Sequence, residues 1–270
     1  MIESRPIDAP KRGWESVPSE VDRSLATEAK EELFSRISAW LTRLLDYPGF
    51  REWKDEAARR QITFAILPHL PVESFNDFEF DQQTIRQHDI VTSYMRLMGA
   101  ANDCRMVQYY FRRFPFRSLP VGREEHVRTC CELYYSRIYQ FEQRLKAALT
   151  LIERRTIPKG LKLDHLRRAF REQLKAELDE RNQIHHQAAY SDFEIEALGV
   201  TDLLSSASDN YPRMAATHYR RLTQQWGVRV KATAETLDFW VGVVAVLLLA
   251  RCPFLVSDAQ SLLSPGSEEG

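Results

Sequence analysis

A regular series of apolar residues runs through residues 127–152, VRTCCELYYSRIYQFEQRLKAALTLI. Its apolar positions step by four and three residues alternately: Val127, Cys131, Tyr134, Ile138, Phe141, Leu145, Ala148 and Ile152. Side chains at this spacing lie along one side of an α-helix, so the segment predicts a long helix with one face packed against partner helices. Gly122 precedes it and Pro158 with Gly160 follows it, which sets its ends.

The same helical period continues through the other long segments and sets the fold class. Glycine and proline are sparse between the two ends of the chain, and no segment sustains the alternation typical of a β-strand. We therefore predict an all-α fold, a helical bundle with an N-terminal helical extension. Breaks in the pattern divide the chain into a disordered tail over 1–25, an N-terminal helical region over 26–118, a helical bundle over 119–256 and a second disordered tail over 257–270.

Individual helices are predicted from the apolar positions and the breaks between them. We expect an apolar stripe over 33–44, a second helix over 53–67 and a third through 90–111. Asp164 is expected to cap a helix that runs through Leu178 toward residue 186. A pair of helical stretches, around 219–230 and 239–250, is expected near the C-terminus.

The composition is that of an ordinary globular protein. The chain has 270 residues, 44% hydrophobic and 28% charged, which excludes a wholly disordered chain and a disulfide-stapled mini-protein. Lys and Arg number 37 against 38 Asp and Glu, so any contact with nucleic acid must be local. The four cysteines form no CxxC pair, and the first residues carry acids but no apolar signal stretch. We expect a reduced, cytoplasmic protein.

An uncharged run from Phe239 to Ala250 raises the question of a membrane. As a helix it is about 18 Å long, whereas the hydrocarbon of a bilayer is about 30 Å thick. We interpret it as a core helix and expect no stable membrane insertion. The alternatives are a segment that lies at the membrane interface or faces another subunit, and a short membrane span.

One arginine interrupts the apolar side of the helix that follows residue 164. On a wheel of 100° per residue, Arg181 falls in the middle of the side defined by Leu166, Phe170, Leu174 and Ile184. Burial of an unpaired charge costs several kcal/mol. Arg181 must therefore have a partner, open into a cleft or face another subunit. His185 lies on the same side, and Asn182 and His186 lie on its flank, one turn apart.

The stretch R-N-x-I-x-H, with Arg181, Asn182 and His186, resembles the R-x(4–6)-H signature of the HEPN superfamily, all-helical domains of which many are metal-independent ribonucleases. Asn182 matches the polar residue that follows the arginine in that family. The order of helices over 120–254 also resembles the HEPN bundle, and the first 118 residues lie outside the likeness. The toxin subgroup with R-x4-H-x-Y has a tyrosine where this chain has Ala188, so we do not expect that subgroup's tyrosine modification.

The resemblance implies cleavage of RNA by attack of the 2′-OH on the adjacent phosphorus. A histidine can move the protons, and an arginine can stabilise the negative phosphorane. Arg181, Asn182 and His186 are the catalytic candidates, with His185 as an auxiliary one, and which histidine acts stays open. No metal and no cofactor is required. Because Arg181 and His186 are about 140° apart on one helix, and family members dimerise around a shared cleft, we expect a homodimer.

We thus predict a metal-independent endoribonuclease that acts on RNA, with a regulatory protein as a further partner and a bacterial defence or toxin-like setting by family analogy. The alternative is a non-catalytic helical module that binds RNA, a nucleotide or a protein. In that module Arg181 and His185 pair across a subunit interface or bind a nucleotide.

The remaining motifs are less specific. A second R-x4-H pair, Arg213 to His218, follows Pro212 at an expected helix start and has Met214 in the polar position, so we treat it as coincidental. The segment 109–117 interleaves aromatic residues with arginines. It is either the end of an amphipathic helix with its aromatics in the core, or an RNA-binding segment that uses Tyr109, Tyr110, Arg112, Arg113 and Arg117.

No metal site is expected from the histidines of the motif. His185 and His186 point about 100° apart on a helix, so they do not chelate one ion together. No acid or cysteine stands at the usual zinc spacing from them.

Overall fold

The computed structural model describes residues 22–67, 76–112, 121–155, 162–186, 190, 192–204 and 210–255, without the side chains of His185, His186 and Pro253. The predicted tails, 1–25 and 257–270, lie outside these ranges except for residues 22–25, which begin the first helix instead. The described residues form α-helices and one short 3-10 helix but no strand, which confirms the all-α fold.

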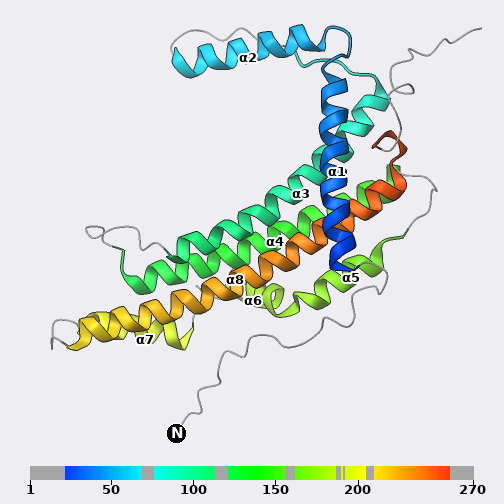
Figure 1. Cartoon of the computed structure of the whole chain (residues 1–270). Coiled ribbons are helices and arrows are strands. Elements are labelled where there is room, and N and C mark those ends of the chain that lie inside the picture. The colour runs from blue at the N-terminus through cyan, green and yellow to red at the C-terminus, as the bar shows by residue number, and fades with distance from the viewer. Residues whose placement is uncertain are drawn as a thin grey trace, which may run out of the picture.

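Eight α-helices are seen in the described ranges (Figure 1). In chain order they are α1 Arg23–Leu44, α2 Phe50–Ile66, α3 Gln82–Arg112, α4 Arg123–Arg155, α5 Asp164–Gln173, α6 Lys175–His186, α7 Phe193–Leu203 and α8 Asn210–Arg251, and a 3-10 helix follows over Pro253–Leu255.

The central helix is α4, the one predicted from residues 127–152. It begins directly after Gly122, and all eight apolar residues of the predicted series are buried. They pack against α3 and α8, and α6 and α7 also lie against α4. The prediction of a long helix with one buried face is confirmed.

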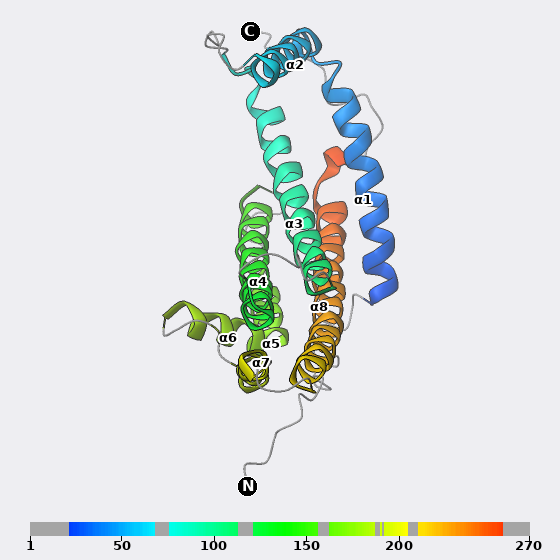
Figure 2. The same cartoon turned by 90° about the vertical axis from the view of Figure 1, so that its left-hand side faces the viewer.

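The long helices α3, α4 and α8 lie side by side, and α1 packs along α8 (Figures 1 and 2). Buried residues from all four belong to one hydrophobic core. Helices on both sides of the predicted boundary at 118 therefore share a core, and the division into two regions stays a prediction. α1 and α8 meet so closely that a Cβ on Gly242 would lie 2.4 Å from the carbonyl oxygen of Ala26.

One continuous helix, α8, replaces the expected pair of stretches near the C-terminus, so that prediction was wrong. Residues 231–238, between the two stretches, contain neither glycine nor proline, and the helix runs through them unbroken. By length and composition α8 is the one described helix that is able to cross a membrane. Most of its apolar window is buried in the bundle, including Trp240, Val244 and Leu248, as a core helix requires.

The helix expected from residue 164 to residue 186 is divided at Leu174 into α5 and α6. Leu174 has φ −113° and ψ 25°, outside the helical region. The turn allows Phe170 of α5 and Leu178 of α6 both to reach the core. Asp164 is not the cap that we expected: it is the first helical residue, and the cap position holds Leu163.

α2 stands apart from the bundle (Figure 1). It begins at Phe50, earlier than predicted, after Gly49 with φ +76°. None of its residues is buried. Its contacts are aromatic, with the Phe50 ring centroid 5.1 Å from that of Phe78 and 4.9 Å from that of Phe80.

Candidate functional site

The R-N-x-I-x-H stretch occupies the second half of α6, a helix that packs on α4. On its inner side α6 presents Leu178 to the core and Glu177, which is only 7% exposed. Arg181 follows on the same side and is half-buried. The predicted position of Arg181 on the apolar side is therefore found, although α5 and α6 are separate helices.

Arg181 rests on an aromatic ring of α4. Its Cζ atom lies 3.6 Å from the centroid of the Tyr139 ring, within the range of a cation–π interaction. Its Nη1 donates a hydrogen bond of 3.3 Å to Oδ1 of Asn182, and its Nε is buried without a hydrogen-bond partner. Of the three expected environments, the structure provides a partner within the chain, and the guanidinium retains unused donor capacity.

The other members of the motif differ in how far they are described. Asn182 is exposed, with its Oδ1 turned to Arg181. His185 and His186 form the last two positions of α6 in backbone terms, and their side chains lie outside the described residues. Asn182 and His186 are one helical turn apart, which holds both at the C-terminal end of α6.

Beneath the motif lies an ion pair between a buried carboxylate and a half-buried guanidinium, which the sequence did not indicate. Nη2 of Arg229 in α8 donates to Oε1 of Glu177 at 3.3 Å. The Arg229 Cζ atom also lies 5.0 Å from the Trp226 ring and 5.7 Å from that of Tyr135. Burial lowers the pKa of the Arg229 guanidinium, but the facing tyrosines and Glu177 outweigh it and hold that pKa above its ordinary value. This pair ties α6 to α8.

A further tie comes from Tyr190, which follows α6. Its ring is buried, with its centroid 5.5 Å from that of Tyr135, and burial raises the pKa of its hydroxyl. Its backbone N–H donates to Oε1 of Glu132 at 3.2 Å. Contacts to α4 and α8, and those of Tyr190, thus hold the position of α6.

Sequence reasoning missed Tyr139, Glu177 and Arg229. The available signal was the four-residue spacing between Glu177 and Arg181, which places both on one side of a helix. Their partners in α4 and α8 lie far away in sequence, so only the fold identifies them.

The second R-x4-H pair is at the start of α8, as expected. Arg213 is exposed in the first turn, whereas His218 is partly buried, with its Nε2 lacking a hydrogen-bond partner. Burial, with Arg221 nearby, lowers the pKa of His218. No described contact joins Arg213 to His218.

The segment 109–117 is described only as far as Arg112. Tyr109 and Tyr110 are 50% and 53% exposed, and Arg112 is exposed as well. Phe111 between them points inward and stacks on Trp226, with 5.7 Å between ring centroids. The alternative in which the aromatics enter the core thus holds for Phe111 and fails for both tyrosines. Arg113 and Arg117 lie outside the described residues.

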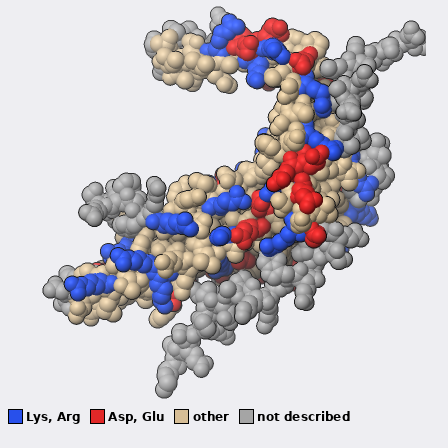
Figure 3. Space-filling view, viewed as in Figure 1, with Lys and Arg blue, Asp and Glu red and all other residues tan. Residues whose placement is uncertain are grey.

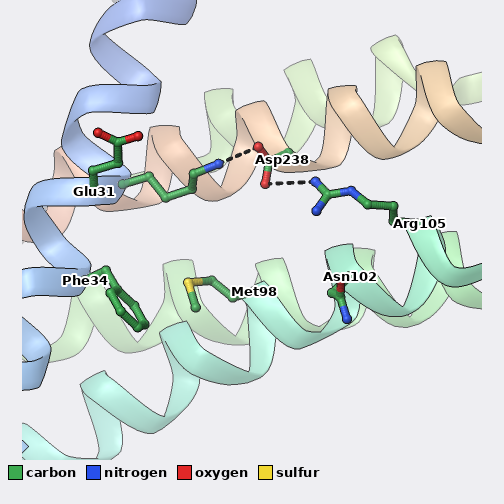
Figure 4. A pocket seen from close by; sticks show the side chains of 7 residues that line it. Glu31, Phe34, Met98, Asn102, Arg105 and Asp238 are labelled. Carbon is green, nitrogen blue, oxygen red and sulfur yellow. Dashed lines mark hydrogen bonds and ion pairs between the residues drawn. The ribbon is translucent and has the colours of Figure 1, made fainter.

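A shallow pocket of about 330 Å³ opens between α1, α3 and α8 (Figure 4). Asp238 accepts from Lys30 Nζ at 2.5 Å and lies 3.5 Å from Nη2 of Arg105, so both cations are engaged. The side chains that line it are Lys30, Glu31, Phe34, Met98, Asn102, Arg105 and Asp238. Within the described ranges, no three His, Cys, Asp or Glu residues gather as a metal site would require.

In comparisons with known proteins, no family model, no curated protein and no solved structure matches the chain.

Proposed function

We propose that this chain is a metal-independent endoribonuclease of the HEPN type, cytoplasmic and active as a homodimer. The observation that supports the proposal is the half-buried Arg181, held on Tyr139 beside Asn182 and followed on the same short helix by two histidines. A guanidinium kept at a defined place is suited to bind a phosphate.

In the proposed reaction a histidine of the motif removes the proton of the 2′-OH. The 2′ oxygen then attacks the adjacent phosphorus, and the bond from phosphorus to the 5′ oxygen breaks as that oxygen receives a proton. The products are a 2′,3′-cyclic phosphate and a 5′-OH. Arg181 stabilises the added negative charge of the phosphorane, and the stacking on Tyr139 fixes its direction.

The homodimer follows from the angular spread of the motif. Arg181 and His186 point about 140° apart around α6, so one helix does not direct both at one phosphate. A second copy that brings its own α6 to the same cleft supplies the missing direction. The expected partners are RNA, a second copy of this chain and a regulatory protein.

The test is cleavage of a 5′-labelled RNA in EDTA by wild type, Arg181→Ala and His186→Ala, with His165→Ala as control. His165 is an exposed histidine of α5 and lies outside the motif. We expect wild type and the control to produce 2′,3′-cyclic phosphate ends and both motif variants to lose at least a hundredfold in rate. Equal cleavage by all four proteins contradicts the assignment, and 3′-OH ends contradict the route.

A second candidate is favoured by one observation. Because Tyr139 already provides the Arg181 cation with a partner, the arginine can serve a non-catalytic helical module. Such a module binds RNA without cleaving it. The proposed defence or toxin-like setting separates the two candidates in cells: overexpressed wild type inhibits growth and His186→Ala does not, if the chain is a nuclease.

A further inference from the structure

Two stretches of the chain carry positive charge and no acid. Residues 104–123 contain five arginines, and residues 210–234 contain four arginines and one lysine, yet neither stretch contains Asp or Glu. They hold ten of the 37 Lys and Arg residues in a chain with a net charge of −1. The two segments, which are well separated in sequence, thus have no acidic residue of their own to compensate these ten cations.

The fold brings residues 104–112 of the first segment beside the second, because α3 and α8 run antiparallel and in contact (Figures 1 and 2). Phe111 of α3 stacks on Trp226 of α8, with ring centroids 5.7 Å apart. Cγ of Gln108 lies 4.0 Å from the point where a Cβ on Gly227 would be. The outer sides of the two helices therefore form one continuous surface.

The contribution of α3 to this surface is one stripe of its C-terminal half. Arg105, Tyr109 and Arg112 are exposed and stand at the i, i+4 and i+7 positions, on one side of the helix. Tyr109 is 50% exposed, so its ring is not part of the core. A ring at the surface that is flanked by arginines has the chemistry of a platform on which a base stacks.

The contribution of α8 has the same period. Its exposed residues Arg213, Arg220, Gln224 and Lys231 fall on one side of the helix, the side on which Gly227 meets α3. We call the surface formed by these two stripes the α3–α8 face; its members are Arg105, Tyr109, Arg112, Arg213, Arg220, Gln224 and Lys231.

The charges of this face are only weakly compensated. Arg105 reaches Asp238 at 3.5 Å and Lys231 lies 3.9 Å from Glu235. Arg112, Arg213 and Arg220 form no ion pair with the described residues. Figure 3 shows Lys and Arg along α3 and the N-terminal part of α8, whereas the acidic side chains gather farther along, toward α1.

We propose that the α3–α8 face binds a single-stranded nucleic acid, with phosphates on its arginines and lysine and a base stacked on Tyr109. The Asp and Glu side chains of an acidic polypeptide pair with the cations but offer no aromatic base to stack on Tyr109, so the exposed ring favours nucleic acid. The inference goes beyond the proposed reaction, because neither α6 nor the 2′-OH takes part. A strand of DNA therefore binds as RNA does.

The experiment uses the full chain and a labelled 15-nucleotide single-stranded DNA, which lacks the 2′-OH and is not cleaved by the proposed route. Binding is measured by fluorescence anisotropy over a range of salt concentrations. For wild type we expect binding that weakens steeply with salt. Arg112→Gln combined with Arg220→Gln should lower the affinity at least tenfold and reduce the salt slope by about 0.7 for each phosphate that the variant no longer neutralises.

Stacking on Tyr109 is tested by two variants, one that removes the ring and one that keeps it. Tyr109→Ala should weaken binding by about fivefold to a hundredfold, whereas Tyr109→Phe keeps the ring and the affinity. The control is Arg86→Gln, an exposed arginine of the same helix about 39 Å from Arg112 along the axis. It should bind like wild type.

Three results overturn the inference: no binding by wild type at low salt, an equal loss of affinity in the Arg86→Gln control, or polyglutamate bound as tightly as DNA with no effect of Tyr109→Ala. The last result assigns the face to an acidic protein. Arg181→Ala and His186→Ala should retain DNA binding. A motif variant that binds DNA but does not cleave RNA supports both proposals. A chain that cleaves RNA but does not bind DNA contradicts this inference alone, and a chain that binds DNA but never cleaves RNA contradicts the nuclease alone.

Discussion

The guanidinium carbon of Arg181 lies 3.6 Å from the centre of the Tyr139 ring, which joins α6 to α4 at the middle of the candidate site. The contact explains how the Arg181 charge occupies the inner side of α6 although it forms no ion pair with the described residues. It also restrains the side chain from which a phosphate would be bound. Stability and the proposed activity thus depend on the same contact.

The first prediction concerns the energy of this contact. A double-mutant cycle with Arg181→Met and Tyr139→Leu should give a coupling of about 0.5–2 kcal/mol in the free energy of unfolding, measured in urea. Tyr139→Phe keeps the ring face and should lose much less than Tyr139→Leu. Additive effects of the two substitutions show that the stacking contributes nothing.

The second prediction concerns the ion pair beneath the motif. Arg229→Met leaves Glu177 buried without its partner and should cost on the order of 3 kcal/mol of unfolding free energy. Glu177→Gln retains an acceptor for Arg229 and should cost less. Urea unfolding followed by circular dichroism compares the two. If Glu177→Gln is the more damaging, the pair does not hold α6 as described.

The sequence specified the helices better than it specified their connections. The apolar period of residues 127–152 predicted which side of α4 is buried, because this pattern is local to one helix. The turn at Leu174 and the continuity of α8 depend on packing that sequence spacing does not encode. For the same reason Arg181 was identified from its own helix, but Tyr139 and Arg229 were not.

The third prediction compares two helical glycines. A Cβ on Gly242 would lie 2.4 Å from the backbone oxygen of Ala26, so Gly242→Ala must push α1 from α8 and should cost about 1–3 kcal/mol. At Gly99 the nearest atom is 4.0 Å away, in the flexible side chain of Arg144. Gly99→Ala should therefore stabilise the protein by about 0.5–1 kcal/mol, as alanine does in a helix. Thermal unfolding of both variants shows whether the signs are opposite.

The fourth prediction concerns pH. Burial lowers the pKa of His126, whose Nδ1 lies 3.1 Å from the Tyr219 hydroxyl and whose Nε2 lies 3.6 Å from Sγ of Cys130. The pKa of His218 is also lowered, mainly by burial. The unfolded chain binds these protons more readily than the folded chain. The stability contributed by the two neutral histidines should therefore be fully present above about pH 6.5, and it should be lost as the pH falls through their pKa values in the folded protein.

Unfolding in urea at steps from pH 7.5 to pH 5 measures this loss. The lowered pKa values of Glu142 and Glu153 affect stability only below about pH 4.5, so they do not interfere in this range. His126→Gln should flatten the profile because glutamine does not titrate. A profile as steep as that of wild type assigns the effect to other groups.

The last prediction is that the chain dimerises and that the dimer completes the site. Since Tyr139 satisfies the Arg181 charge within its own subunit, the dimer is not required to relieve a stranded cation, as its position on the apolar side had suggested. The reason for the dimer is instead the direction of the side chains, because Arg181 and His186 point about 140° apart on α6 and one helix does not aim both at the same phosphate.

Light scattering at micromolar concentration should give twice the mass of the 31.5 kDa chain. If each cleft combines Arg181 of one subunit with His186 of the other, subunits of Arg181→Ala and His186→Ala that are mixed, unfolded and refolded together should regain RNA cleavage that neither variant has alone. Refolded Arg181→Ala by itself is the control, and a strict monomer with or without RNA contradicts both the dimer and the shared cleft.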